Sequence, residues 1–273
     1  MLKQRVIPII LLKDGSIVQS RLFSRYQPVG NPFATVKRYN SWDCDELIYL
    51  NISRQNSSAE MRTDLNSKVF STMIDILKEV AQENFIPLTF GGGIRTLKDM
   101  ELFLTNGADK ITVNTLAIES PQIISEAAKE FGSQSIVVSI DAKVNENKEH
   151  FVYLGGKTQT EIELSAFCTR VEEYGAGELL INSIDRDGSG RGYDVDLVKK
   201  ATKSVNIPVI IAGGAGKWED MQEILEHSPV SGVAAANIFH HSENSVYNCR
   251  QFLFDHGINV RKPAKLSFLK RNL

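Results

Sequence analysis

Eight short runs of aliphatic and β-branched residues recur along the chain, and a longer amphipathic stretch follows each of them. The runs cover residues 5–11, 46–52, 86–90, 110–114, 136–141, 178–184, 207–212 and 232–236. Their apolar residues do not alternate with polar ones, so each run is expected to be a strand buried on both faces. Strands of this kind, separated by helical patterns such as 70–83, 120–131 and 166–176, predict an α/β protein with a parallel sheet.

An internal repeat favours a closed barrel over an open sheet. The segment "IPLTFGGGIR" at 86–95 returns as "IPVIIAGGAG" at 207–216, and "RVIPIILLK" at 5–13 returns as "SIVVSIDAK" at 135–143. Two halves of four βα units each close naturally into a (βα)8 TIM barrel. The alternative, a doubly wound sheet, is disfavoured because no GxGxxG turn follows the first strand. Chance similarity of buried strands is the other explanation of the repeat.

The repeat also sets the expected domain organisation. Residues 1–260 are predicted to form one barrel, with half-barrels at 1–132 and 133–260, and 261–273 form a basic C-terminal tail. The polar segment 51–68 is expected to be a long loop after the second strand. The length of 273 residues suits this fold, which typically takes about 250.

Composition excludes several classes of function. The formal net charge is −2, with 31 basic and 33 acidic residues, so we expect neither a nucleic-acid partner nor a membrane surface. The chain has 3 cysteines and no CxxC pair, which argues against a disulfide framework or a structural zinc site. No metal or cofactor is expected. The chain shows no signal-peptide pattern and no apolar run of about 18 residues, so a cytoplasmic location is predicted.

Glycine-rich turns follow the third and seventh strands, where a barrel of this type carries its active site. The first contains Gly92 and Gly93, and the second contains Gly213 and Gly214. Such turns let backbone N–H groups approach an anion closely, although they can equally serve as tight turns alone. The amide side chain of Asn114, after the fourth strand, and that of Asn237, after the eighth, complete one set of anion-binding groups in each half. The two sets predict a ligand with a phosphate at each end.

One carboxylate stands at the centre of this face. Asp141 ends the fifth strand, where it is a candidate general acid or base. The repeat aligns Asp141 with Leu11, so the first strand lacks the carboxylate that symmetry predicts. The loop after the sixth strand adds Asp187 and Gly188 beside the second glycine turn.

Charged residues open four strands at the opposite end. Arg5, Glu46, Lys110 and Glu178 begin the first, second, fourth and sixth strands. If they point inward, two cations and two anions form a ring that closes the bottom of the barrel. Exposed charges at strand starts are the ordinary alternative.

Taken together, these segments resemble the cyclase subunit family of imidazole glycerol phosphate synthase. The resemblance covers residues 1–261 and is carried by "IPLTFGGGIR", "NGADKITVNT", "GAGELLINSIDRDGSGRGYD" and "IPVIIAGGAGK". It implies a (βα)8 barrel of two similar halves. It also implies a glutaminase subunit that docks on the barrel bottom and releases ammonia, forming a heterodimer. The four strand-opening charges match the family's ammonia gate.

The resemblance further implies a phosphorylated ligand at the top of the barrel. Ammonia reacts there with a bis-phosphorylated nucleotide to give imidazole glycerol phosphate and aminoimidazole carboxamide ribonucleotide. The positions that match the family's phosphate ligands are Gly93, Asn114 and Thr115 on one side, and Asp187, Gly188, Gly213, Gly214, Ala236 and Asn237 on the other.

Four positions depart from the family's pattern, all on the catalytic face. Leu11 stands where the family has its first catalytic aspartate, Gln19 replaces a lysine, Asn51 replaces an aspartate and Asn182 replaces a threonine. Because Leu11 cannot transfer a proton, we hypothesise a cyclase-like paralogue. It keeps the glutaminase and the ammonia route but serves a sugar amidotransferase that amidinates a surface-polysaccharide sugar.

Three alternatives remain open at this point. The first is a genuine cyclase subunit of histidine biosynthesis, in which Asp141 or Asp187 covers the missing role. The second is the related sugar-isomerase barrel of the same pathway, which needs no glutaminase. The third is a subunit with a regulatory or assembly role and no catalysis.

Overall fold

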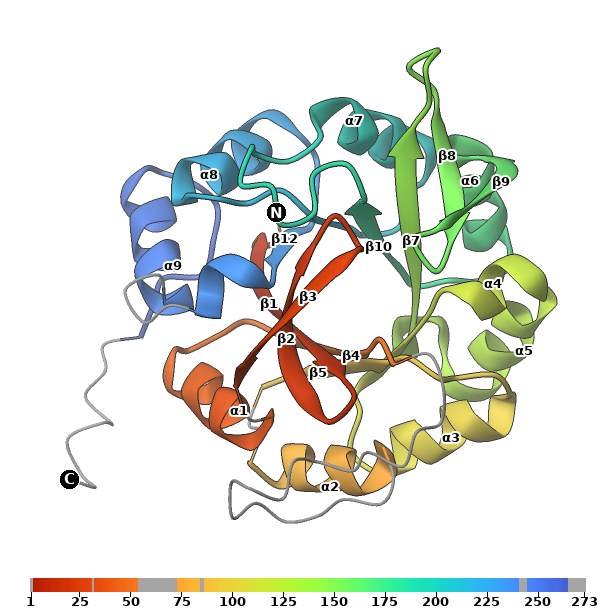
Figure 1. The fold of residues 1–273 in the computed structure, drawn as a ribbon, viewed down its shortest axis with the longest axis horizontal. Helices are drawn as coiled ribbons and strands as arrows, with labels where there is room; N and C mark the ends of the chain where they lie inside the picture. Colours follow the sequence, from red (N-terminus) through yellow and green to blue (C-terminus); the bar gives the residue numbers. More distant parts are fainter. Residues whose placement is uncertain (1, 31, 54–72, 84–85, 241–244, 265–273) are drawn as a thin grey trace.

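The computed structural model describes residues 2–30, 32–53, 73–83, 86–240 and 245–264, and it shows a closed parallel barrel inside a ring of helices (Figure 1). The barrel strands are β1 (Arg5–Lys13), β4 (Leu47–Asn51), β5 (Leu88–Gly91), β6 (Lys110–Val113), β7 (Ile136–Val144), β10 (Glu178–Ser183), β11 (Val209–Ala212) and β12 (Gly232–Ala235). Each pairs in parallel with its neighbours, and the pairing of β7 with β10 and of β12 with β1 closes the sheet. The predicted eight-stranded barrel is therefore confirmed.

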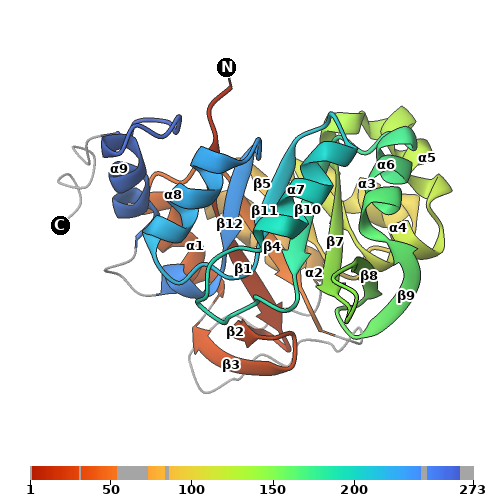
Figure 2. The same cartoon turned by 90° about the horizontal axis from the view of Figure 1, so that it is seen from above.

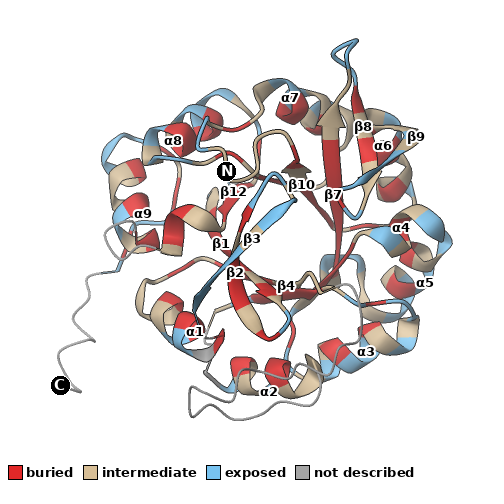
Figure 3. Cartoon of the chain, in the orientation of Figure 1, coloured by how far each residue is buried: buried red, intermediate tan, exposed pale blue. Residues whose placement is uncertain are grey.

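Helices follow every barrel strand, as the sequence predicts. They are α1 (Pro32–Ser41), α2 (Met73–Glu83), α3 (Leu97–Thr105), α4 (Thr115–Glu119), α5 (Gln122–Phe131), α6 (Leu164–Glu173), α7 (Val195–Ser204), α8 (Trp218–His227) and α9 (Val246–Asp255), with short 3₁₀ turns η2 (Ser133–Ser135) and η3 (Asn237–His240). Their buried faces turn toward the barrel in Figure 3. Among the described residues, no helix is long and apolar enough to cross a membrane.

Strand β1 shows why the barrel strands read as continuous apolar runs. Val6, Ile10 and Leu12 pack outward into the core between sheet and helices. Ile7 and Ile9 point the other way, into a separate cluster that fills the barrel interior. Both faces are buried, so both sets of alternating positions must be apolar.

Two β-hairpins extend the barrel strands, and the sequence-based prediction missed both. β2 (Ser16–Arg21) and β3 (Arg25–Gly30) follow β1, and β8 (His150–Leu154) and β9 (Thr158–Glu163) follow β7. Asp14 and Gly15 turn β1 into β2 with φ angles of 47° and 76°, the left-handed pair that an Asp-Gly hairpin turn requires. Figure 2 shows both hairpins at the end of the barrel away from the N-terminus.

The domain boundaries stay a prediction. The predicted loop 51–68 lies outside the described residues from position 54 onward, and so does the tail from 265 onward. Before that point, Arg261 forms ion pairs with Asp43 and Asp45, so the described start of the tail is fastened beside the N-terminal ends of the strands.

Candidate active site

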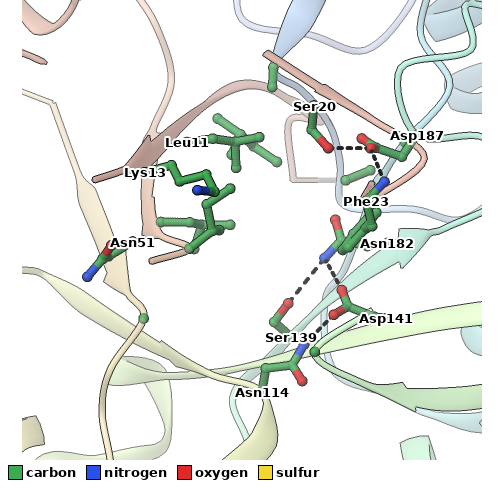
Figure 4. A pocket seen from close by; sticks show the side chains of 18 of the residues that line it. Leu11, Lys13, Ser20, Phe23, Asn51, Asn114, Ser139, Asp141, Asn182 and Asp187 are labelled. Carbon is green, nitrogen blue, oxygen red and sulfur yellow. Dashed lines mark hydrogen bonds between the residues drawn. The ribbon is translucent and has the colours of Figure 1, made fainter. Parts of the chain in front are cut away.

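A cavity of about 990 Å³ opens at the C-terminal ends of the barrel strands, where both hairpins lie (Figure 4). Its lining includes most of the residues predicted for this face: Leu11, Gly92, Gly93, Asn114, Thr115, Asp141, Asp187, Gly188, Gly213, Gly214, Ala236 and Asn237. Catalytic groups in barrels of this kind come from the ends of several strands. The fold therefore brings the predicted residues into one site, although their individual roles stay predictions.

Asp141 is the buried carboxylate of this cavity, at 5% exposure. Its two oxygens accept hydrogen bonds from Asn114, which directly follows β6, and from Asn182 on β10. Asn114 Nδ2 lies 3.0 Å from Oδ2, and Asn182 Nδ2 lies 3.1 Å from Oδ1. Burial raises the pKa of Asp141 to about 6, against the opposing effect of these two amide donors. A carboxyl group with a pKa near neutrality is suited to both giving and taking a proton.

Leu11 lies across the barrel from Asp141 (Figure 4), because β1 and β7 are four strands apart in a closed sheet of eight. It is partly buried and packs with Leu50 and Ala236 against the apolar cluster of the barrel interior. Leu11 is paired with Leu50 on the neighbouring strand β4. At the level of Leu11 and Leu50 this wall of the cavity is thus aliphatic, whereas Lys13 and Asp14 line the cavity two and three residues further along the chain.

The three other departures from the family pattern have separate surroundings. Asn182 joins the Asp141 cluster, since its amide also lies 3.2 Å from Ser139 Oγ. Asn51 lines the cavity, but its Oδ1 accepts from the backbone N–H of Ser53 at 3.1 Å. Gln19 lines a smaller neighbouring hollow of about 260 Å³ instead of the main cavity. Of the four departures, only Asn182 therefore hydrogen-bonds the Asp141 carboxylate.

The two glycine-rich turns flank the cavity as predicted. Gly92 has φ +98°, and a Cβ there would meet the backbone oxygen of Asn51 at 2.0 Å. Gly214 has φ +117°, and a Cβ there would meet the backbone oxygen of Gly192 at 2.2 Å. Both positions require glycine for local packing. Gly93, by contrast, has open space where a Cβ would stand, so a ligand can approach its backbone.

The β2–β3 hairpin lies over the second set of predicted phosphate ligands. Ser20 Oγ donates to Asp187 Oδ2 at 2.6 Å, and the backbone N–H of Phe23 donates to the same oxygen at 3.2 Å. Asn237 Nδ2 donates to the backbone oxygen of Ser20 at 2.7 Å. Burial also raises the pKa of Asp187. Sequence reasoning missed this contact, in which two predicted ligand residues hold a hairpin of their own chain.

Four charged side chains close the other end of the barrel interior. Arg5 donates hydrogen bonds to both glutamates, and its Nη1 lies 2.7 Å from Glu46 Oε2. Lys110 also contacts both, because its Nζ lies 3.1 Å from Glu46 Oε1 and 2.8 Å from Glu178 Oε2. Burial opposes ionisation of Glu178, but the bonds and charges of Arg5 and Lys110 keep its pKa below the ordinary value. The predicted charged ring therefore exists as a closed cycle of ion pairs.

Replacing Asp141 by asparagine tests the raised pKa through stability. Because the pKa of Asp141 is higher in the folded protein than in the unfolded chain, its proton stabilises the fold. This contribution is complete below about pH 4 and is lost as the pH rises through 6. Asp141→Asn stays neutral throughout. Its free energy of unfolding, relative to wild type, should therefore rise by about 3 kcal/mol between pH 4 and pH 8 in denaturant titrations.

Ser139→Ala is the control for that measurement. Ser139→Ala changes the same polar cluster without removing a titratable group. The difference between its free energy of unfolding and that of wild type should therefore stay constant with pH. A constant difference for Asp141→Asn as well would show that Asp141 has an ordinary pKa.

Among the described residues, no group of three or more His, Cys, Asp or Glu side chains is placed to hold a metal ion. The fold and the site define the class of protein: a closed (βα)8 barrel with a buried carboxylate at one end and a charged ring at the other. The chain belongs to the histidine biosynthesis protein family, whose family profile matches residues 5–245.

Individual members of that family are similar over nearly the whole chain. The imidazole glycerol phosphate synthase subunit HisF of Streptococcus mutans is 40% identical over 262 residues, covering 96% of this chain and 100% of the relative. The subunit HisF of Hydrogenobaculum is also 40% identical over 262 residues, with the same coverage. That of Anoxybacillus flavithermus is 38% identical over 263 residues. This barrel is therefore HisF-like throughout its length.

Proposed function

We propose that this chain is the barrel subunit of a two-component glutamine amidotransferase. A glutaminase subunit docks over the N-terminal ends of the strands and releases ammonia there. Ammonia passes the ring of Arg5, Glu46, Lys110 and Glu178, crosses the barrel interior and reaches the cavity around Asp141. The glycine turns of that cavity bind the phosphate groups of the acceptor.

The closed ring is the observation that carries this proposal. Glu46 and Glu178 have side chains only 3% and 6% exposed, and each contacts both cations. Removing ions from water costs several kcal/mol each, and apolar residues of similar size commonly stabilise a barrel floor as well. A ring of four charges therefore calls for a role beyond stability, and controlled passage of a small polar molecule supplies one.

The comparisons favour the cyclase reaction as the fate of the ammonia. Relatives that match the chain over 96% of its length are named as imidazole glycerol phosphate synthase subunits, and none of the named relatives points to another acceptor. In this case, ammonia and a bis-phosphorylated nucleotide give imidazole glycerol phosphate and aminoimidazole carboxamide ribonucleotide. Asp141 transfers the protons that ring closure requires.

The second candidate is amidination of a surface-polysaccharide sugar through a sugar amidotransferase, and it rests on one observation that weighs against the cyclase reaction. The aliphatic wall of Leu11 and Leu50 faces Asp141 where the resemblance implies a second catalytic carboxylate. Losing one partner of an acid–base pair typically costs about 10²–10⁴ in rate. An ammonia-dependent cyclase assay separates the two: turnover typical of the named relatives supports the cyclase, and turnover lower by those factors supports the other acceptor.

Complex formation with the glutaminase subunit of the same organism tests the shared part of the proposal. Two exposed leucines provide a matched pair, because Leu2 is 91% exposed near the N-terminus and Leu22 is 45% exposed on the β2–β3 turn. Leu2→Asp should weaken the complex at least tenfold, about 1.4 kcal/mol, whereas Leu22→Asp should not. No complex with wild type, or greater sensitivity to Leu22→Asp, would contradict docking at the barrel bottom.

A further inference from the structure

Asn182 connects two polar side chains of a neighbouring strand. It lies on β10, where the register pairs it directly with Asp141 on β7. Ser139 lies two residues before Asp141, so the two side chains share the inward face of β7. Figure 4 shows the Asn182 side chain reaching toward both of them. One residue of β10 therefore contacts the catalytic carboxylate and its polar neighbour at the same time.

The Asn182 amide uses both of its protons in these contacts. Its Nδ2 lies 3.1 Å from Asp141 Oδ1 and 3.2 Å from Ser139 Oγ. An amide NH₂ group has two protons, so neither contact competes with the other. Turning the amide over would lose both bonds and bring its oxygen against the carboxylate. The bond to Ser139 therefore fixes the orientation in which Asn182 donates to Asp141.

The two oxygens of Asp141 depend on different donors. Oδ1 accepts from Asn182, whereas Oδ2 accepts from Asn114, which lies on the other side of β7. Each amide thus serves one oxygen, and together they fix the plane of the carboxylate. A buried polar atom without a partner is unfavourable. Removing Asn182 takes from Oδ1 the side-chain donor that it has within the described residues.

The protonation of Asp141 depends on the balance between burial and these donors. Burial raises the pKa of Asp141 to about 6, and of the two amides Asn182 has the larger opposing effect. Asp187 raises the pKa further, and it shares the cavity with three other charged residues, Lys13, Asp14 and Lys157. Because a hydrogen bond to a charged group typically shifts a pKa by about one to two pH units, loss of the Asn182 bond is sufficient to keep Asp141 protonated at neutral pH.

We infer that Asn182 is a positioning residue that holds the Asp141 carboxylate in one orientation and keeps it ionised at neutral pH. An ionised Asp141 takes the proton that a nitrogen nucleophile loses when its bond to the acceptor forms. The inference deepens the proposed function, because it rests on Asp141 as the proton-transfer group. It also assigns a role to a departure from the family pattern, since the single proton of a threonine hydroxyl cannot be donated to both Asp141 and Ser139.

A pH titration of the Asp141 carboxyl carbon by ¹³C NMR tests this inference in the purified chain. The signal is assigned by its loss in Asp141→Asn. Asn182→Leu has a similar size and no donor, so we expect the pKa of Asp141 to rise by about one to two pH units. Asn106→Leu is the matched control, because the Asn106 amide bonds the backbone oxygen of Leu102 on α3, outside the cavity lining. It should titrate like wild type.

A second pair of variants separates the hydrogen bond from the size of the side chain. Asn182→Thr and Asn182→Val have the same shape, but only the threonine hydroxyl can donate to Asp141, so the pKa of Asp141 should be higher in Asn182→Val. This pair also decides the matter if Asn182→Leu does not fold. A titration of Asp141 that is the same in wild type and in the variants without a donor would overturn the inference.

The titration uses neither the acceptor nor the glutaminase. It therefore decides the role of Asn182 whether or not the proposed function holds. Failure of the proposed function appears separately, as the absence of a complex with the glutaminase, whose docking at the N-terminal ends of the strands does not involve Asn182.

Discussion

Replacing Leu11 by aspartate is expected to raise ammonia-dependent cyclase turnover by about 10²–10⁴-fold. The change places a carboxylate on β1, across the cavity from Asp141, and so supplies an acid and a base on opposite faces of a bound ligand. Leu11 is only partly buried, so the new carboxylate reaches the water of the cavity and the fold tolerates it. The measurement is turnover at saturating ammonium with the bis-phosphorylated nucleotide.

Leu50→Asp is the matched control for this gain. Leu50 pairs with Leu11 on the neighbouring strand and belongs to the same aliphatic wall. The substitution therefore adds the same carboxylate to this wall but places it on β4, in a different position relative to Asp141. It should give no increase. The double variant Leu11→Asp/Asp141→Asn should also lose the gain. If wild type already turns over as fast as Leu11→Asp, then another residue performs the proton transfer, and Asp187 is the first candidate.

Replacing Lys110 by alanine is expected to uncouple glutamine from the acceptor reaction. Lys110 bonds both glutamates, so its removal leaves Arg5 as the one cation that pairs with Glu46 and Glu178 among the described residues, and it opens the ring. Ammonia released by the glutaminase then mixes with solvent ammonia. We expect glutamine-dependent turnover to fall by at least tenfold while turnover with saturating ammonium changes less than twofold, since the cavity is untouched.

The control for that loss is Lys98→Ala, an exposed lysine on the outer helix α3. It removes the same charge from the outer helix layer and should leave both rates unchanged. Lys110→Met, which keeps an unbranched apolar stem in place, should uncouple like Lys110→Ala. Equal loss of the glutamine-dependent and ammonium-dependent rates in both variants would show that Lys110 supports the fold and has no part in ammonia passage.

The strand positions and the ring could be predicted because each depends on a local pattern. Strands buried on both faces are apolar throughout, and four charges that open strands can all point into the same barrel end. Asp141 could be predicted because it interrupts an apolar strand at its C-terminal end. In each case the place of the residue along its own strand carries the signal, whereas the ion pairs of the ring join residues 41 to 173 positions apart.

The hairpins and the hydrogen bonds of the site could not be predicted in the same way. The bond between Ser20 and Asp187 joins residues 167 positions apart, and that between Ser20 and Asn237 joins residues 217 positions apart. No local pattern reports such a pairing. One local signal was available, since Asp14-Gly15 between apolar runs is a typical hairpin turn.

The most direct test of a glutaminase-coupled barrel is the rate of glutamine hydrolysis. The glutaminase subunit of the same organism is assayed alone, and then with an equimolar amount of this chain and a bis-phosphorylated nucleotide. We predict that the barrel increases hydrolysis and that the increase requires docking at the N-terminal ends of the strands, so Leu2→Asp reduces it. A hydrolysis rate unchanged by the barrel, with no complex formed, would contradict this function.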